Sequence, residues 1–433
     1  MAGVMDRVSP NRELGTKLLW TFALLCCYRV GVHIPVPGVD TSALAHFFAS
    51  LQGSVFALLD MFSGGGLRNV SVFALGIMPY ISASIILQLM QVISPEVKRL
   101  AKEEGQAGRR KITQWTRYLT VGITIVQGFG IAALLEGMMS PENTPVVTNP
   151  GLEFRLVTVA TLCAGTILIM WLGEQITAHG IGNGISLIIF SGIVVGIPGA
   201  LARSFQLINA GDMNIIFAVF LLAAMLAVTV GIVFMERAQR RIPIHYAKRQ
   251  MGRKVYGGQT THLPLRINTA GVIPPIFAQS LLLFPATVAG FSHADWIQRV
   301  VSWFQPTSIL YNIIFVGLIF FFCYFYTAII FDPKDIAENL RKAGGFIPGI
   351  RPGEKTREYI DTVLGRLTLW GGVYISAVSV LPMLLIAQFN VPFYFGGTSL
   401  LILVGVAIDF MGQVESLMIS NQYKSVLDRT KKR

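Results

Sequence analysis

Ten long apolar runs, each almost free of charged residues, constrain this sequence more than any other feature. Each run is about as long as the 17–25 residues that an α-helix needs to cross a bilayer. Of the 433 residues, 53% are hydrophobic and 13% are charged, whereas soluble domains average about 45–50% apolar and about 25% charged residues. A bilayer is therefore the expected solvent. The predicted spans are residues 15–35, 70–93, 117–137, 154–174, 184–201, 214–235, 268–288, 308–331, 366–388 and 399–418.

The basic residues are distributed unevenly around these predicted spans. With ten spans both ends of the chain lie on one side of the membrane, and thirty of the 35 Lys and Arg residues then fall on that side. Cytoplasmic segments carry such an excess of positive charge, so both termini are predicted to be cytoplasmic. Topology thus explains much of the net charge of +12. The five exceptions are Arg29, Arg68, Arg155, Arg203 and Arg299.

The sequence carries no recognisable catalytic or metal-binding motif. It contains neither a Walker A loop nor an HExxH pair, and we expect no cofactor, no metal and no enzymatic activity. The four cysteines lie inside apolar runs, without the spacing of metal ligands or of a disulfide framework. The first apolar run lacks a small-residue processing site, so it is predicted to be a permanent span.

Two basic segments are long enough to project from the cytoplasmic side. Residues 237–266 contain two strand-like stretches with Met251 and Gly252 near the turn between them, which predicts a hairpin. In the second segment, about 333–362, a helix-like stretch ends near Lys342 and a Gly- and Pro-rich turn follows.

The connection between the fifth and sixth predicted spans divides the chain into two halves, residues 1–205 and 206–433. Five spans per half is an odd number, so any internal symmetry between the halves would be inverted, as in many transporters. No clear sequence repeat relates the halves, so this prediction depends on topology alone.

Two of the predicted spans contain residues that interrupt helices. Gly76 and Pro79 lie in the second span, and Pro274, Pro275 and Pro285 lie in the seventh. Proline in a membrane helix frees backbone carbonyls that neighbouring groups must satisfy. These residues are compatible both with simple kinks and with helices that move or line water.

A short apolar stretch, LLDMFSGGG at residues 58–66, precedes the second span. It is too short to cross a bilayer and too apolar for an ordinary loop. The residues alone leave open a re-entrant helix, an interfacial helix or a segment that only packs against its neighbours.

The ionisable residues bear on three classes of function. A coupled transporter would place a carboxylate near the bilayer centre, and an enzyme would cluster catalytic polar residues at one interface. The predicted spans are poor in charge, with Asp409 and Glu415 in the tenth span as the main exceptions. The residues therefore favour a channel with a cytoplasmic partner, with a secondary transporter and a polytopic membrane enzyme as the alternatives.

Several stretches along the chain resemble one family of membrane proteins. They include FSGGGLRNVSVFALGIMPYISASII, EGQAGRRKITQWTRY, GIGNGISLIIFSGIV, YAKRQMGRKVYGGQTTHLPLRINTAGVIPPIFAQS, GGFIPGIRPGEKTREYI and GGTSLLILVGVAIDFMGQVESLM. In this order they are similar to the SecY/Sec61-alpha family of protein-conducting channels, over nearly the whole chain. The resemblance implies an all-α polytopic membrane protein, with ten transmembrane helices in two inverted five-helix halves around a central hourglass pore.

The resemblance also implies a seal inside the pore. A narrow aliphatic ring excludes water and ions, and here the ring would consist of Ile81, Ile85, Ile189, Ile276 and Ile402, with Ile185 and Ile193 lining the pore beside it. The stretch from about 54 to 66 would be a plug helix in the extracytoplasmic funnel. Its residues would include Phe56, Leu59, Met61, Phe62, Gly64, Gly65 and Gly66.

Two further sites follow from the resemblance. A lateral gate between the second and seventh spans would involve Ser84, Pro274 and Phe284. The two cytoplasmic segments would dock the ATPase SecA and the ribosome, both its RNA and the proteins at its exit site. The docking residues would be Arg351, Arg240, Arg241, Lys248, Arg249, Arg253 and Lys254.

The function implied by the resemblance is passive protein conduction. Unfolded secretory polypeptides would cross the bacterial cytoplasmic membrane, and transmembrane segments would leave sideways into its lipids. SecA or the ribosome would supply the driving force to nascent chains and preproteins. SecE and SecG would be the partner subunits, and SecDF and YidC are expected as auxiliary factors.

Overall fold

The computed structural model describes residues 10–40, 44, 60, 63–102, 104–137, 145–211, 214–246, 249–251, 254–256, 260–289, 308–389 and 397–431. Ten helices in this part of the chain coincide with the predicted spans. They are α1 (Pro10–Gly31), α4 (Met78–Ile93), α6 (Gly105–Gly137), α7 (Leu152–His179), α8 (Gly184–Ala210), α9 (Ile215–Arg237), α10 (Ile273–Ala289), α12 (Ile309–Ile330), α14 (Glu354–Phe389) and α15 (Gly397–Lys431).

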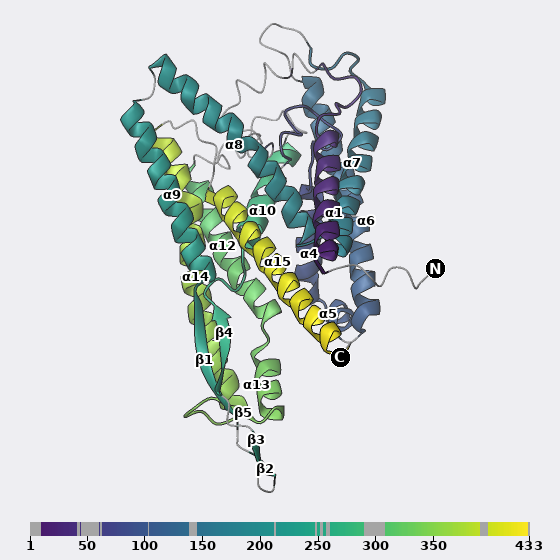
Figure 1. Ribbon diagram of the computed structural model, residues 1–433. Helices are drawn as coiled ribbons and strands as arrows, with labels where there is room; N and C mark the ends of the chain where they lie inside the picture. The colour runs from purple at the N-terminus through teal and green to yellow at the C-terminus, as the bar shows by residue number, and fades with distance from the viewer. Residues whose placement is uncertain are drawn as a thin grey trace.

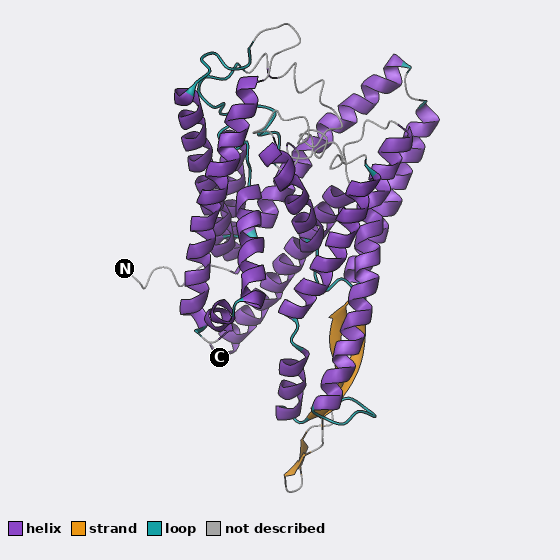
Figure 2. Ribbon diagram, turned by 180° about the vertical axis from the view of Figure 1, so that it is seen from behind, coloured by secondary structure: helices purple, strands orange, loops and turns teal. Residues whose placement is uncertain are grey.

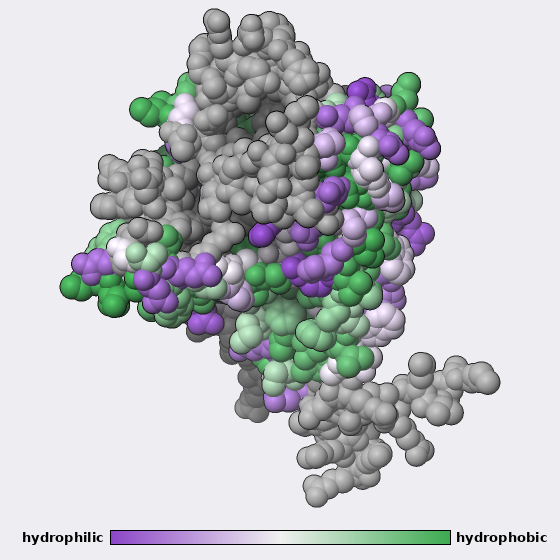
Figure 3. Space-filling model, turned by 90° about the horizontal axis from the view of Figure 1, so that it is seen from above, coloured by the Kyte–Doolittle hydropathy of each residue, from purple (hydrophilic) through white to green (hydrophobic). Residues whose placement is uncertain are grey.

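The helices run side by side in one bundle (Figures 1 and 2), and in the view from above hydrophobic and polar side chains are mixed over its described part (Figure 3). Seven of the described helices are long and apolar enough to cross a membrane by themselves. The count becomes eight when α4 and the following α5 (Pro95–Lys102), which are bent by 106° relative to each other, are taken as one span. The bend falls at Ser94, whose extended backbone is the conformation that a following proline imposes.

Hydropathy located the spans but misplaced several helix ends. The helices α6 and α14 begin at Gly105 and Glu354, about three turns before the predicted starts, and α15 continues to Lys431. The added turns are rich in charged residues, which are good helix formers. Hydropathy therefore marks the ends of the apolar run, whereas the helix itself continues through the charged residues beyond that run. The second span differs in the opposite sense, because residues 71–77 form turns and α4 begins at Met78.

A strand-bearing projection extends from one end of the bundle (Figures 1 and 2). Its long hairpin pairs β1 (Gln239–Tyr246) with β4 (Thr260–Arg266). At its tip β2 (Arg249–Met251) pairs with β3 (Lys254–Tyr256), and the register Met251↔Lys254 confirms the predicted turn position. The predicted all-α class thus holds for the helical bundle. In the described part of the chain, the five named strands all belong to the projection.

The projection unites the two segments that were predicted to be cytoplasmic in one small domain. The second segment contributes α13 (Pro333–Lys342), as predicted, and the two-residue strand β5 (Gly345–Phe346), which was not predicted. β5 pairs with β1 through His245↔Phe346 and Tyr246↔Gly345. A separate apolar core fills the space between these elements and the start of α14; its buried members are Ile242, Ile244, Leu265, Leu340, Ile347, Ile360, Val363 and Leu364.

The first and last helices of the bundle both have their outer ends on the side of the projection. α1 begins and α15 ends toward the end of the bundle from which the projection extends (Figure 1). In the middle of the bundle α10 packs against α4 and α12, while α15 packs against α1 and α8. Helices from the two predicted halves therefore meet at the centre.

Candidate functional site

A large cluster of buried hydrophobic side chains, both aliphatic and aromatic, lies inside the bundle. The five isoleucines of the predicted ring belong to one hydrophobic cluster and are between 0% and 7% exposed. They come from four helices, namely α4, α8, α10 and α15. The structure therefore brings together residues that lie far apart in the sequence. The five are Ile81, Ile85, Ile189, Ile276 and Ile402.

Helical spacing explains how α4 and α8 present these residues. Ile81 and Ile85 are four positions apart and share a face of α4. Ile189 has Ile185 and Ile193 one turn away on either side. Ile193 is buried in the same cluster, and Ile185 is half-buried and packs against it. The structure thus places all seven predicted aliphatic residues in or against one cluster.

The five ring positions share one chemistry, because each carries the same aliphatic side chain. Aliphatic side chains have no hydrogen-bond donors or acceptors, so they offer no fixed partner to water, an ion or a peptide group. A narrow constriction of this kind blocks ions by excluding water. Among the described residues, no three His, Cys, Asp or Glu side chains lie close enough together to hold a metal ion.

The two helices of the predicted lateral gate contact each other in the structure. The hydroxyl of Ser280 in α10 lies 3.9 Å from the sulfur of Met78 in α4. Pro274 is buried in the first turn of α10, where proline fits a helix without losing a hydrogen bond. Phe284 belongs to α10, but its side chain is outside the described residues.

The predicted gate residue Ser84 belongs to a polar chain that joins α4 to α12, and the other two members of this chain were not predicted. Gln88 donates from its amide nitrogen to the hydroxyl of Ser84 over 2.9 Å. Its amide oxygen accepts a short hydrogen bond from the hydroxyl of Tyr326 in α12. On α10, Gln279 is 1% exposed, and neither amide atom has a partner among the described residues. Glutamines inside otherwise apolar spans are the sequence signal that could have pointed to this seam.

The plug prediction falls largely outside the described residues. Phe56, Leu59, Met61 and Phe62 all lie there, and their placement is not described. The glycine triplet at 64–66 is described and forms a tight turn with Ser63 and Asp60. Gly64 and Gly65 have φ values of 65° and 89°, a region that favours glycine.

The predicted docking residues divide into described and undescribed ones. Arg240 and Arg241 lie exposed on β1, and Arg351 is exposed in the turn before α14. None of the three has an ion-pair partner among the described residues, whereas Lys342, Lys355 and Arg357 pair with glutamates of their own helices. Arg249 and Lys254 lie on β2 and β3 with undescribed side chains, and Lys248 and Arg253 lie outside the described residues.

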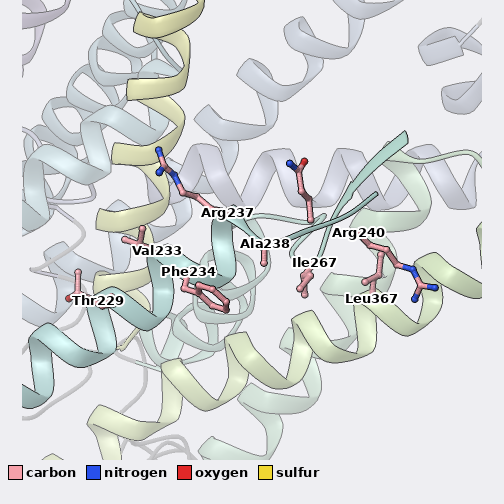
Figure 4. A pocket seen from close by; sticks show the side chains of 10 residues that line it. Thr229, Val233, Phe234, Arg237, Ala238, Arg240, Ile267 and Leu367 are labelled. Carbon is pink, nitrogen blue, oxygen red and sulfur yellow. The ribbon is translucent and has the colours of Figure 1, made fainter. Parts of the chain in front are cut away.

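A groove with a volume of about 770 Å³ lies at the base of the projection, where α9 passes into β1 (Figure 4). Phe234 and Val233 of α9, with Ile267 and Leu367, give it an apolar lining. Its other lining residues include Arg240, and none of the five ring isoleucines contributes to it.

Asp409, the carboxylate of the tenth predicted span, was the main residue in favour of a transporter. It forms an ion pair at the surface of the structure. Asp409 in α15 lies 3.8 Å from the guanidinium of Arg266, and both side chains are more than 60% exposed. An exposed ion pair of this kind is common at the surface of a protein. It is unlike the buried carboxylate that a coupled transporter requires.

Comparison with known proteins identifies the family. A family model described as SecY matches residues 71–411, which is well over half of the chain. The chain belongs to the SecY family. The SecY-family subunit "Protein translocase subunit SecY" of Aquifex aeolicus is 49% identical over 429 residues, covering 99% of this chain and 100% of the relative. The protein of the same description from Escherichia coli strain K12 is 50% identical over 423 residues, covering 96% and 94%.

Solved structures support the SecY-family fold. A structure described as a protein conducting channel has a TM-score of 0.67 at 18% identity and covers 96% of this chain and 94% of its own. Sec61 in a canine ribosome-channel complex has a TM-score of 0.62 at 15% identity, with coverages of 96% and 94%. The family resemblance and the polytopic membrane fold expected from the sequence are thereby confirmed.

Proposed function

We propose that this chain forms the channel through which a bacterial protein translocase moves unfolded polypeptides across the cytoplasmic membrane and releases transmembrane segments into the lipid. Membership of the SecY family, whose relatives are translocase subunits, supports this function. The observation that carries it is that five isoleucines from four helices lie in one buried hydrophobic cluster.

The aliphatic ring suits a substrate of arbitrary sequence. A folded pocket with fixed polar groups would favour some peptides and reject others, because unmatched buried polar groups are costly. Isoleucine side chains yield to a passing chain without such a penalty and close again when it leaves. At rest the ring, together with the plug segment, would seal the pore against ions.

Lateral release would occur between α4 and α10. Their described polar contact is the weak hydroxyl–sulfur interaction of Ser280 with Met78, so most of their adhesion is apolar packing that lipid or a substrate helix can replace. Partitioning would then sort the substrates. Leucine-rich segments gain by entering lipid, whereas each central charge costs about 2.5–3.5 kcal/mol.

The driving force would come from a partner that docks on the projection. Arg240, Arg241 and Arg351 are exposed there and have no ion-pair partner in the described part of the chain, which suits RNA phosphates or an acidic protein surface. We infer that SecA and the ribosome use this side, with both termini in the cytoplasm. SecE and SecG would be the membrane partners, with SecDF and YidC as auxiliary factors. The similarity in fold to Sec61 in a ribosome-channel complex is consistent with this orientation.

Photocrosslinking to a stalled secretory chain tests the function. Photoreactive residues at Ile85, Ile189 and Ile276 should all react with the stalled polypeptide. Val219, which is 62% exposed on the flank of α9, is the matched control and should remain silent. Reaction at Val219 together with silence at all three isoleucines would contradict a path through the ring.

A further inference from the structure

Three buried hydroxyl groups of α14 and α15 have no hydrogen-bond partner among the described residues. The side chains of Ser376, Ser379 and Thr398 are 7%, 0% and 1% exposed, and each of their hydroxyl oxygens is without a partner there. Buried polar groups in native proteins nearly always have a partner, either another protein group or ordered water. These three hydroxyls therefore need a partner that the described side chains do not supply.

The two serines of α14 differ from the threonines earlier in the same helix. Thr362 and Thr368 each donate to the backbone carbonyl oxygen one turn earlier, over 2.8 Å, which is a common way for a helix to satisfy a hydroxyl. Ser376 and Ser379 make no such bond among the described residues. Thr398 is the second residue of α15, so it has no helical carbonyl one turn earlier to which it can donate.

A close backbone contact brings the three hydroxyls to one place. Ser376 and Ser379 are three residues apart and share a face of α14. A Cβ atom added to Gly397, the first residue of α15, would overlap the carbonyl oxygen of Val378 and lie 2.8 Å from the Cα of Ser379. Thr398 follows Gly397 directly. The first turn of α15 therefore rests on the turn of α14 that carries the serines.

The chemistry of these groups fits water better than an ion. A hydroxyl both donates and accepts hydrogen bonds, and a buried water makes about two to four of them. The first turn of a helix also has backbone N–H groups without an intrahelical acceptor, which suits a small anion. The helix terminus, however, contributes much less free energy than the burial of an unpaired charge costs. The groups therefore favour a neutral ligand that can both donate and accept.

The three hydroxyls lie beside the cluster that holds the ring isoleucines. Ser379 follows Ile375 by four residues on α14, and Thr398 precedes Ile402 by four residues on α15. Both isoleucines are buried members of that cluster. Because α14 leads away from the projection and α15 leads back toward it (Figure 1), Ser379 and Thr398 lie on the same side of the cluster, the side that faces away from the projection.

We propose that ordered water occupies this site, bridges the hydroxyls of Ser379 and Thr398, and so fixes α15 against α14 next to Ile402. Ser376 is a further hydrogen-bond partner for the same water. A polar layer with bound water then lies directly beside the apolar layer that contains the ring isoleucines. This inference concerns the contact of two helices, and it is independent of the path proposed for a polypeptide.

The sign of a change in melting temperature tests the proposal, measured on the channel complex purified with its partner subunits. Removal of a hydroxyl that is buried without water should raise the melting temperature or leave it unchanged. Removal of a hydroxyl that holds water also leaves the other polar groups unsatisfied. Ser379→Ala and Thr398→Val should therefore each lower the melting temperature by about 2 °C. Alanine is a better helix former than serine, so helix propensity does not explain a fall at position 379.

The double variant shows whether the two residues share one water. Either substitution removes a shared water, so Ser379→Ala combined with Thr398→Val should lower the melting temperature by about as much as one substitution alone. Thr124→Val is the matched control. Thr124 on α6 is 1% exposed, and its hydroxyl donates directly to the carbonyl oxygen of Thr120 over 2.7 Å. Its effect should add to that of Thr398→Val, because the two sites are independent.

A cryo-electron microscopy map of the parental complex tests the occupancy directly. If the map resolves water elsewhere, it should show density within hydrogen-bond distance of the hydroxyls of Ser379 and Thr398. A map without this density, or single variants whose melting temperatures do not fall, would overturn the water site. Additive losses in the double variant would overturn the bridge between the two residues. A parental melting temperature that rises when chloride replaces gluconate, with no rise in Thr398→Val, would assign the site to an anion instead.

Discussion

The hydroxyl of Ser280 and the sulfur of Met78 lie 3.9 Å apart although the two residues are 202 positions apart in the chain. They join α10 to α4 through a contact that contributes little energy, since a thioether is a weak acceptor. Among the described residues of α4 and α10 this is the polar contact across the seam, so the described part of the seam can open without breaking a strong polar bond.

Covalent closure of this seam should stop lateral release. In a background without the native cysteines, a Met78→Cys and Ser280→Cys pair should, when oxidised, reduce the integration of membrane proteins at least ten-fold. Protease protection of a reporter helix in vesicles measures this integration. Reduction of the disulfide in the same sample should restore it; unchanged integration after verified oxidation would place the exit elsewhere.

A polar side chain in the aliphatic cluster should make the resting pore leak. Ile189→Asn places an amide at a position that is 2% exposed, where an unsatisfied polar group costs about 1–3 kcal/mol. Water that solvates this amide should increase resting conductance roughly ten-fold. Val219→Asn, at an exposed site on α9, is the control, and equal conductance in the two variants would count against a seal at Ile189.

Charge reversal in the projection should uncouple the channel from its motor. Arg351→Glu should reduce ATP-dependent export into vesicles several-fold and leave folding unchanged, because Arg351 is exposed and makes no ion pair among the described residues. Lys342→Glu is the control, since Lys342 is already neutralised by Glu338. Added salt should weaken the docking of the parental protein and narrow the difference between the two. Full export by Arg351→Glu would exclude a docking role.

The turn that contains Asp60, at the end of the predicted plug segment, should respond to pH. Burial raises the pKa of this carboxyl above its usual value, although the amide of Arg68 opposes the shift. A raised pKa means that the folded turn binds the proton more tightly than the unfolded chain does. Its contribution to stability is therefore full in acid and is lost as pH rises through the raised value.

Resting conductance measured across this pH range tests that prediction. It should rise as the pH increases from acid to neutral in the parental protein. Asp60→Asn keeps an acceptor for the Arg68 amide but does not titrate, so its conductance should stay flat. An identical pH profile in both proteins would assign the response to another group.

Much of the fold could be predicted from the sequence because apolar run length is a strong signal. The ten helices and the hairpin turn at Met251 follow from such local patterns. The two-residue strand β5 has no periodicity of its own, and it exists only because His245 and Tyr246 of a distant segment pair with it. Helix ends were missed where charged residues continue the helix beyond the bilayer, as at Glu354.

In the candidate site, too, local patterns could be predicted from the sequence and contacts between distant segments could not. Spacing predicts that Ile81 and Ile85 share a face, but only the resemblance to a family joined them to Ile402, because no local pattern distinguishes a ring isoleucine from one that faces lipid. The hydroxyl of Tyr28 donates a hydrogen bond to the backbone carbonyl oxygen of Ser63. Every residue has a backbone carbonyl, so the residue type at position 63 could not predict this hydrogen bond.

The pairing of β5 with β1 has a mechanical consequence. This pairing and a common core join residues 239–266 to residues 333–364. A force applied to either segment is therefore transmitted to the other, and the projection moves as one lever. Its short arm is the link from β4 to α10, which is only six residues long. A partner that binds the far end would therefore tilt α10, the helix proposed to border the lateral gate, and a small displacement of α10 would follow from a larger displacement of the projection's tip.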